Sequence, residues 1–437
     1  MLSLIIILAI ALAIFLGYKT KINTGLFCIV FAFIIGCFAM DLRPKDLIGF
    51  WPVNTMFVIL SVSLFYNVAA INGTLEKMSG ALLYSCRHFP GILPYALFAV
   101  AVILSVMGAT YFTVLAFLAP ITLIICDESR MDKLTGAVAI NCGALAGGDF
   151  PTSNLGVVFR GLADTAYENN PDLPAIDTFG MQMKIFMFSI IFSLIIVSIF
   201  RFAMKSNRNI GKDVAFKKPE AFTAPQKTTL TLMLVMMVLV LIFPMLKVFN
   251  PNNAVIARIA GKMDVGLVAV IFAVIALLLH LAPQKEAIAR IPWNTIIMIA
   301  GAGMLIAVAV EAGTIDMLSN WVSSNVPKLL IPAVFSIIAA IMSFFSSTTG
   351  VVTPALFPLI PALAATCGIS APVLFACTVL GAQSSAISPF SSGGSLILGS
   401  VPKEEERNTM FNRLLLTAVP ICVLCCAAYN FLLAILM

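Results

Sequence analysis

Two polar segments interrupt the most apolar parts of this chain, and their residue types suit the binding of small ions. Residues 147–154 read Gly-Gly-Asp-Phe-Pro-Thr-Ser-Asn, and residues 384–394 read Ser-Ser-Ala-Ile-Ser-Pro-Phe-Ser-Ser-Gly-Gly. Pro151 and Pro389 each remove a backbone hydrogen bond, so neither segment continues a regular helix. Freed carbonyls and hydroxyls suit Na⁺, whereas N–H groups at a new helix start suit a carboxylate. The alternative is a pair of proline kinks with Ser and Thr packed between helices.

Asp149 is the one acid in its apolar stretch, and Ile387 occupies the matching position of the second segment. A carboxylate at membrane depth is a functional candidate by default. It could ligate a cation or carry a coupling proton. The alternative is an aspartate at a loop end that water reaches.

Hydroxyl side chains also cluster in two long uncharged stretches. They lie at residues 108–113 and 346–350. Such clusters could bind substrate oxygens or Na⁺, or they could bond to the backbone within a helix.

The two breaks belong to an internal repeat. Residues 143–156 match 381–394 through Gly, Ala, Pro, Ser and Gly at the same places, and Thr110 matches Thr348 at the same offset. An Asn-Thr and Gly-Thr pattern earlier in each half recurs after 240 residues. The repeat predicts that the two breaks do related chemistry.

Composition identifies the environment that must hold these segments. The 437 residues are 61% hydrophobic and 11% charged, with a mean hydropathy of +1.05. A soluble domain would carry roughly 25% charged residues. Two scattered histidines argue against an enzyme with a metal or histidine centre, and no Gly-x4-Gly-Lys-Ser/Thr loop indicates a nucleotide-driven pump. The net charge of +6 follows from membrane topology and does not imply nucleic-acid binding.

Apolar blocks of about 20 residues predict helical crossings. The expected spans are 3–19, 24–41, 48–71, 134–161, 180–202, 227–248, 264–282, 292–312, 372–401 and 411–436. Two further stretches, 89–126 and 329–366, are each a re-entrant hairpin or a pair of tight spans.

Orientation follows from the loops. Most of the 26 Lys and Arg residues fall on one side, including the basic loop 203–226. The positive-inside rule puts this side in the cytoplasm and both termini outside. We therefore expect a multi-pass protein of the inner (plasma) membrane.

The expected fold class is an all-α polytopic membrane protein with two inverted repeats of about five spans, each with a re-entrant hairpin and a broken helix. The first repeat is 1–202, the cytoplasmic linker is 203–226, and the second repeat is 227–437. An odd number of crossings per repeat turns the second copy upside down, as in many secondary transporters.

A hydroxyl-rich hairpin tip followed by a broken Gly/Pro/Ser/Asn helix, repeated after about 240 residues, resembles the ion transporter superfamily, which includes the divalent anion:sodium symporters. Residues 147–154 look most like the MatC-type malonate/dicarboxylate carriers. The resemblance implies a scaffold domain, a transport domain that moves as an elevator, and a homodimer.

The resemblance also implies binding residues at both tips and both breaks. Substrate contacts would come from Thr110, Tyr111, Thr152, Ser153, Asn154, Thr348, Thr349, Ser391 and Ser392. One Na⁺ site would use Thr110, Gly148, Asp149 and Asn154, and the second would use Ser347, Thr348, Ala386 and Ser388.

The expected function is secondary transport of a small dicarboxylate, malonate or a C4 acid, driven by Na⁺ and without a resident cofactor. The alternative on the same fold is an H⁺-coupled or exchange permease for another organic anion. The alternatives from other classes are a membrane-embedded enzyme and a channel. An enzyme is disfavoured because only Asp149 is a deep acid and histidines are scarce. A channel is disfavoured because paired breaks would seal the path from each side and so favour alternating access. The expected partners are a small organic anion, the lipid bilayer and a second copy of the chain.

Overall fold

The structure is a computed structural model of the whole chain. It describes residues 2–436, apart from 21, 86–91, 171, 175, 205–219, 250–252, 261, 345–347 and 402. The described residues form helices joined by short turns, without β-strands. Much of the expected linker 203–226 therefore lies outside the described residues, as does Ser347.

Over its described residues, the first half contains ten α-helices and one short π-helical segment, η1. They are α1 (Leu2–Thr20), α2 (Thr24–Phe33), η1 (Ile34–Ala39), α3 (Pro44–Gly49), α4 (Val53–Ile71), α5 (Thr74–Ser85), α6 (Leu93–Val106), α7 (Tyr111–Ser129), α8 (Lys133–Gly148), α9 (Asn154–Glu168) and α10 (Thr178–Ala203).

The second half is divided into more and shorter pieces. They are α11 (Ala224–Phe249), α12 (Ala254–Ala260), α13 (Val265–Leu278), α14 (Gln284–Ala289), α15 (Trp293–Glu311), α16 (Thr314–Asn325), η4 (Lys328–Leu330), α17 (Ile331–Phe344), η5 (Thr348–Val352), α18 (Thr353–Leu356), η6 (Phe357–Leu359), α19 (Ile360–Cys367), α20 (Ala371–Ser384), α21 (Ser392–Gly399), α22 (Glu404–Arg413), η7 (Leu414–Ala418) and α23 (Val419–Leu436).

Several helices have the length and apolar composition of membrane spans. Among the described residues four helices qualify, namely Thr178–Ala203, Ala224–Phe243, Thr348–Cys367 and Glu404–Leu436, or five if one bent pair counts as a single span. Eight shorter helices of 10–17 residues are also apolar. An apolar helix satisfies its own backbone hydrogen bonds in lipid, which is why this composition folds into helices.

Three helices of the first half recur 240 residues later with the same bounds. The pairs are α3 with α14, α4 with α15, and α5 with α16. Gly73 and Gly313, which precede α5 and α16, have φ angles of +74° and +67°. This left-handed conformation favours glycine, so the repeated Gly-Thr marks the same sharp turn in both halves.

The helix before each break packs closely on a neighbour. A Cβ atom on Gly143 in α8 would overlap the Phe98 carbonyl in α6, and one on Gly381 in α20 would overlap the Ser336 carbonyl in α17. Both pairs are 238 residues apart. Small residues at these positions let two apolar helices approach without a side chain between them.

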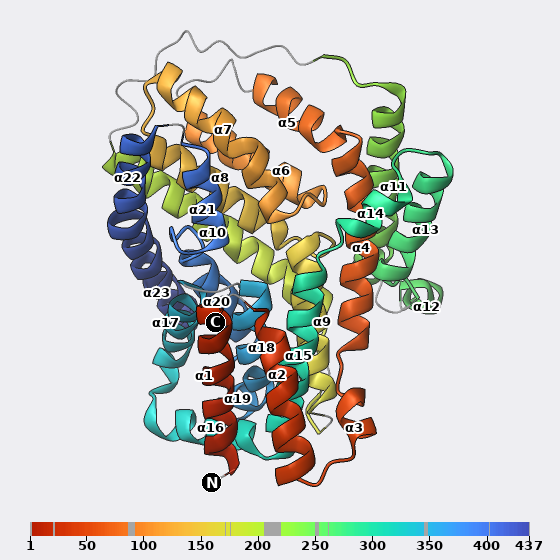
Figure 1. Cartoon of the computed structure of the whole chain (residues 1–437), viewed down its shortest axis with the longest axis vertical. Helices are drawn as coiled ribbons and strands as arrows, with labels where there is room; N and C mark the ends of the chain where they lie inside the picture. The colour runs from red at the N-terminus through yellow and green to blue at the C-terminus, as the bar shows by residue number, and fades with distance from the viewer. Residues whose placement is uncertain are drawn as a thin grey trace.

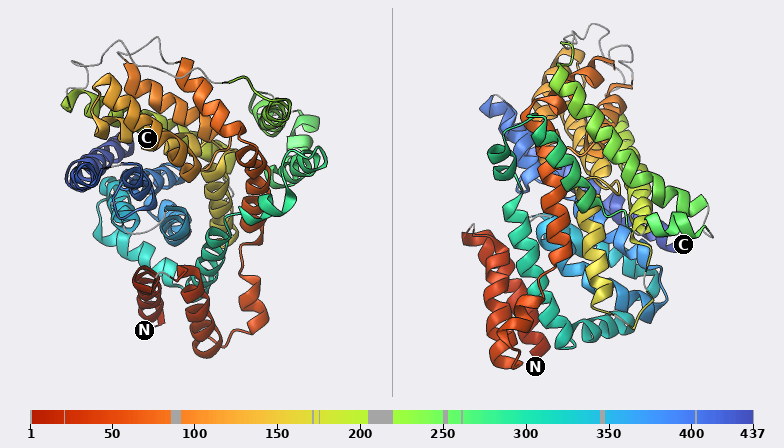
Figure 2. Two further views of the ribbon diagram at one scale, coloured as in Figure 1. Left: turned by 45° about the horizontal axis from the view of Figure 1, so that its top comes forward. Right: turned by 90° about the vertical axis from the view of Figure 1, so that its right-hand side faces the viewer.

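Figure 1 shows α5, α6, α7 and α8 in the upper part of the molecule and α16, α18 and α19 in the lower part. Helices α11, α12 and α13 lie along the right edge. The N-terminal helices α1 and α2 lie at the periphery in both views of Figure 2. Phe159, Phe357 and Phe375 join the halves in the core, with ring centroids 6.0 and 4.7 Å apart in turn.

Candidate functional site

Both expected helix breaks are present, and in each break one serine side chain hydrogen-bonds to the backbone of the break. Helix α8 ends at Gly148 and α9 begins at Asn154, while α20 ends at Ser384 and α21 begins at Ser392. The Ser153 hydroxyl donates to the carbonyls of Gly148 and Phe150, the latter at 2.8 Å.

The Ser391 hydroxyl donates in the same pattern to the carbonyls of Ala386 and Ser388, at 2.5 and 2.7 Å. In each break the serine hydroxyl therefore bonds carbonyl groups between the two helices, where the regular helical ladder has stopped. Both hydroxyls serve the backbone of their own break.

The first hydroxyl-rich segment forms the start of α7. Gly108, with a φ angle of +94°, turns the chain between α6 and α7. The Thr110 side chain caps α7 by accepting from the Thr113 amide at 3.2 Å. Thr110 thus holds the helix N-terminus where the two helices meet.

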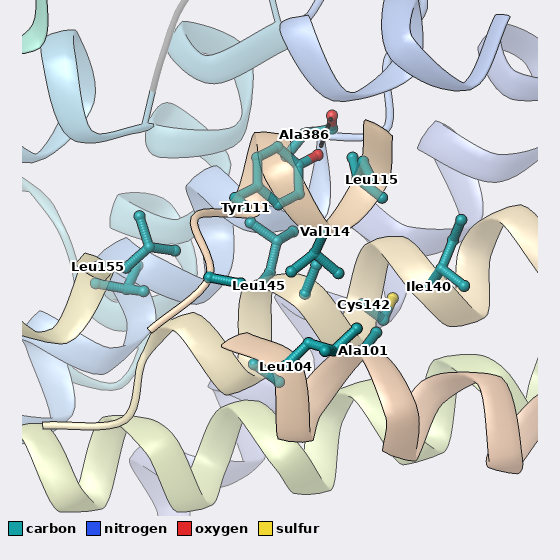
Figure 3. Close-up of a cluster of buried hydrophobic side chains, with 14 of the residues drawn as sticks. Ala101, Leu104, Tyr111, Val114, Leu115, Ile140, Cys142, Leu145, Leu155 and Ala386 are labelled. Carbon is teal, nitrogen blue, oxygen red and sulfur yellow. Dashed lines mark hydrogen bonds between the residues drawn. The ribbon is translucent and has the colours of Figure 1, made fainter. Parts of the chain in front are cut away.

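Tyr111 connects this tip to the second break. Its hydroxyl donates to Asn141 Oδ1 at 2.6 Å and lies 3.4 Å from the Ala386 carbonyl oxygen. Figure 3 shows the Tyr111 ring beside Ala386, with Leu145 and Leu155 nearby. The close approach requires Gly393, because a Cβ there would overlap the Tyr111 hydroxyl.

The second hydroxyl-rich segment begins η5. Thr348 Oγ1 and Ser343 Oγ share a hydrogen bond of 3.2 Å, and Thr353 Oγ1 donates to the Thr348 carbonyl at 3.0 Å. The segment 329–366 is therefore several short helical pieces in its described part, whereas 89–126 is two longer helices over its described residues.

One cavity of about 300 Å³ lies where these pieces meet. The starts of α7, α9 and α21 all reach its wall, and so do Thr348 and Thr349 at the start of η5. Unpaired N–H groups and the helix dipole make helix N-termini favourable positions for an anion. The volume lies at the small end of ligand-binding pockets.

The cavity contains most of the expected substrate residues. Its wall includes Thr110, Tyr111, Asn154, Thr348, Thr349 and Ser391. Thr152 and Ser153 are fully buried and are not part of that wall. For Ser392 the backbone alone is described, and it begins α21.

The residues expected to bind Na⁺ divide in the same way. Thr110, Asn154, Thr348 and Ala386 line the cavity. Gly148, Asp149 and Ser388 lie behind the wall, among the buried residues. Ser347 lies outside the described residues.

Asp149 belongs to a buried polar group between three helices. Its Oδ1 atom accepts from Gln383 Nε2 at 2.7 Å, and its backbone carbonyl accepts from Gln182 Nε2 at 2.7 Å. All three residues are at most 6% exposed. The carboxyl group therefore ties the first break to α20 of the other half, and a charge here would need compensation in the low-dielectric interior.

Sequence reasoning missed several polar residues around the site. Asn141 and the two glutamines above are single amides in apolar helices, and that isolation is the signal that could have found them. Ser63 and Asn67 line the cavity from one face of α4. Arg290, which the sequence marked only as a basic loop residue, lines it from the end of α14.

A second cavity, of about 600 Å³, lies farther along α9. Arg160 lines it together with Asp164, Glu168 and Asp264. The acids outnumber the base, so this cavity lacks the anion-favouring character of the first.

Together the apolar helices, the paired breaks and the cavity between them are typical of a multi-pass membrane transport protein. Residues 178–436 match the family model described as the sodium:sulfate symporter transmembrane region. Residues 1–148 match the model for the N-terminus of the dicarboxylate carrier protein MatC. The first match covers more than half of the chain, so the chain belongs to the sodium:sulfate symporter family.

A solved structure supports the fold. The chain is similar to the YdaH transporter of Alcanivorax borkumensis, with a TM-score of 0.63 and 16% sequence identity over 88% of this chain and 86% of that one. At this identity the likeness concerns the fold alone. A search of curated proteins found no match.

Proposed function

We propose that this protein is a Na⁺-coupled secondary transporter of small dicarboxylates, malonate or a C4 acid, in the inner membrane. The observation that carries the proposal is the convergence of the α7, α9 and α21 N-termini on one cavity of about 300 Å³. An anion there gains from each helix dipole, and the described wall carries no carboxylate to oppose it. The names of the two matching families, a dicarboxylate carrier and a sodium:sulfate symporter, agree with such a cargo.

Coupling to Na⁺ is the less direct part of the proposal. Thr110 and Asn154 from the first half, and Thr348 and Ala386 from the second, offer the oxygen ligands that Na⁺ needs. Asp149 and Gly148 would complete the first site, and Ser347 and Ser388 the second, if the breaks rearrange during transport.

The proposed mechanism is an elevator built on two inverted repeats, 1–202 and 227–437, in a homodimer. The matching helix bounds, the two breaks closed by equivalent serines and the two equivalent close packings support a repeated architecture. Inversion gives the two breaks opposite orientations around one site near the midplane, which suits alternating access.

The test is uptake of radiolabelled malonate and succinate into liposomes that contain the purified protein. Each run has an imposed Na⁺ gradient, a pH gradient or neither. The proposal expects uptake that requires inward Na⁺. No uptake of either acid under any gradient, from protein shown to be folded, would exclude the dicarboxylate assignment.

The second candidate, H⁺ coupling, is favoured by the buried position of Asp149 and its bond to Gln383. Replacing Asp149 by Asn retains the shape but removes the ionisable group. If H⁺ drives transport through this residue, D149N abolishes uptake under a pH gradient. If Na⁺ drives it, wild-type uptake follows the Na⁺ gradient and D149N weakens its Na⁺ dependence.

A further inference from the structure

Among the described residues that line the cavity, Arg290 alone has a charged side chain. The rest of that wall consists of hydroxyls, amides, backbone and apolar groups. A wall of this kind can orient many small molecules, but a single cation decides which net charge is accepted.

The position of Arg290 is anchored although its side chain is half exposed. It follows the short helix α14, whose Ala287 is fully buried and accepts a hydrogen bond at its carbonyl from Asn67 Nδ2 at 3.0 Å. Asn67 also lines the cavity, so α14 is fastened to the α4 wall beside it.

The guanidinium group of Arg290 pairs with Glu286, and this exposed ion pair is weak enough for another anion to displace it. Arg290 Nη2 lies 2.7 Å from Glu286 Oε1, and the two side chains are 48% and 43% exposed. An exposed pair one helical turn apart contributes little to stability. Because Arg has five N–H donors in a planar fork, a second carboxylate can bind beside Glu286 or replace it.

The first half supplies no equivalent cation. The position 240 residues before Arg290 is Phe50, while Glu286 corresponds to Asp46. Asp46 pairs instead with Arg43, at 2.7 Å, on the equivalent helix α3. Neither Arg43 nor Asp46 lines the cavity. The positive charge at the cavity wall therefore comes from the second half of the chain alone, among the described residues.

We propose that Arg290 recognises the charge of the substrate by exchanging its Glu286 partner for a substrate carboxylate at the cavity wall. This inference rests on the proposed function and adds a residue that selects dianions over monoanions. Helix N-termini and hydroxyls bind one carboxylate, and the guanidinium binds the other. Glu286 holds the guanidinium in place until the substrate arrives.

The test compares R290Q, R290K and E286Q with wild type in the liposome assay, using malonate and succinate. R290Q should raise KM on the order of 10-fold with a smaller change in Vmax, because a hydrogen bond to a charged group is lost. R290K should have an intermediate KM, since it retains the charge but loses the planar fork. E286Q should lower KM, because the competing carboxylate is gone.

R43Q is the matched control, because it breaks an exposed Arg–carboxylate pair at the corresponding helix α3, away from the cavity. Its KM should equal that of wild type. An R290Q protein with a wild-type KM would overturn the inference, and an E286Q protein with a raised KM would overturn the exchange step.

Calorimetric binding of sulfate, malonate and acetate separates this inference from the proposed function. If wild type transports no dicarboxylate but binds sulfate, and R290Q weakens that binding more than R43Q does, the cargo assignment fails and the role of Arg290 stands. If R290Q weakens monoanion and dianion binding equally, charge selection by Arg290 is excluded.

Discussion

At the residue scale, the site is held together by side chains that reach from one half of the chain to the other. Tyr111 joins the first tip to Asn141 and to the second break, and Asp149 joins the first break to Gln383. Because the contacts of Tyr111 with Ala386 and of Asp149 with Gln383 join the two halves, a change in one break should alter the contacts of the other.

Replacing Tyr111 by Phe should test this connection. The buried Asn141 Oδ1 atom would lose its donor, which costs roughly 1–3 kcal/mol of unfolding free energy. Thermal unfolding in detergent measures the loss, and the KM of uptake should rise as the tip loosens. Y429F is the control, because the Tyr429 hydroxyl donates over 3.3 Å from a half-buried position. An equal loss in both variants would refute a special role for Tyr111.

At the element scale, close helix packing fixes where the breaks lie. Gly143 and Gly381 allow the helix before each break to touch its neighbour backbone to backbone. The packing of α8 on α6 and of α20 on α17 therefore fixes where each helix ends, and α9 and α21 begin beyond these ends at the cavity wall.

Gly381→Ala should be destabilising by roughly 1–3 kcal/mol, because the added methyl group has no room against the Ser336 carbonyl. Gly399→Ala is the matched control in the neighbouring helix α21, since a Cβ there meets no atom within 4 Å. It should be neutral or slightly stabilising. Thermal unfolding of the two variants and wild type measures this difference in stability. A Gly381→Ala protein as stable as wild type would contradict the packing argument.

At the scale of the whole molecule, ion pairs at one edge join the two halves of the chain. Lys133, at the start of α8, lies 2.7 Å from Glu406 in α22, and Arg413 lies 2.8 Å from Asp132. These pairs hold the start of the first broken segment against the helix that follows the second.

Acid should weaken this connection. The hydrogen bond from Lys133, followed by that from Lys403, lowers the pKa of Glu406 below its ordinary value of about 4.5. Glu406 lies in the acidic first turn of α22, before the expected span 411–436 and outside the apolar part of Glu404–Leu436. Because the folded-state pKa of Glu406 is lower than its unfolded-state pKa, the ion pair stabilises the protein at pH values above the unfolded-state pKa. This stabilisation is lost as the pH falls through the folded-state pKa.

As the pH falls below about 4.5, thermal unfolding of E406Q should accordingly show less loss of stability than wild type does. E404Q, in the same first turn of α22, is the control and should follow the wild-type profile. The same acid sensitivity in E406Q and wild type would show that this pair does not join the halves measurably.

Local residue chemistry was sufficient for the membrane class, the family resemblance and the two breaks. Apolar blocks force helices in lipid, and Pro151 and Pro389 must interrupt them wherever the chain goes. The same holds for Gly73 and Gly313, because the turn they allow depends on their own backbone.

Tertiary structure alone decided which polar groups meet. Thr152 and Ser153 have the same residue types as Thr110 and Ser391, yet the former pair is buried behind the cavity wall and the latter pair forms it. Arg290 is one basic loop residue among many until α14 docks on α4. Spacing along the chain determines where a helix breaks, whereas the packing of helices distant in sequence determines which side chains face one cavity.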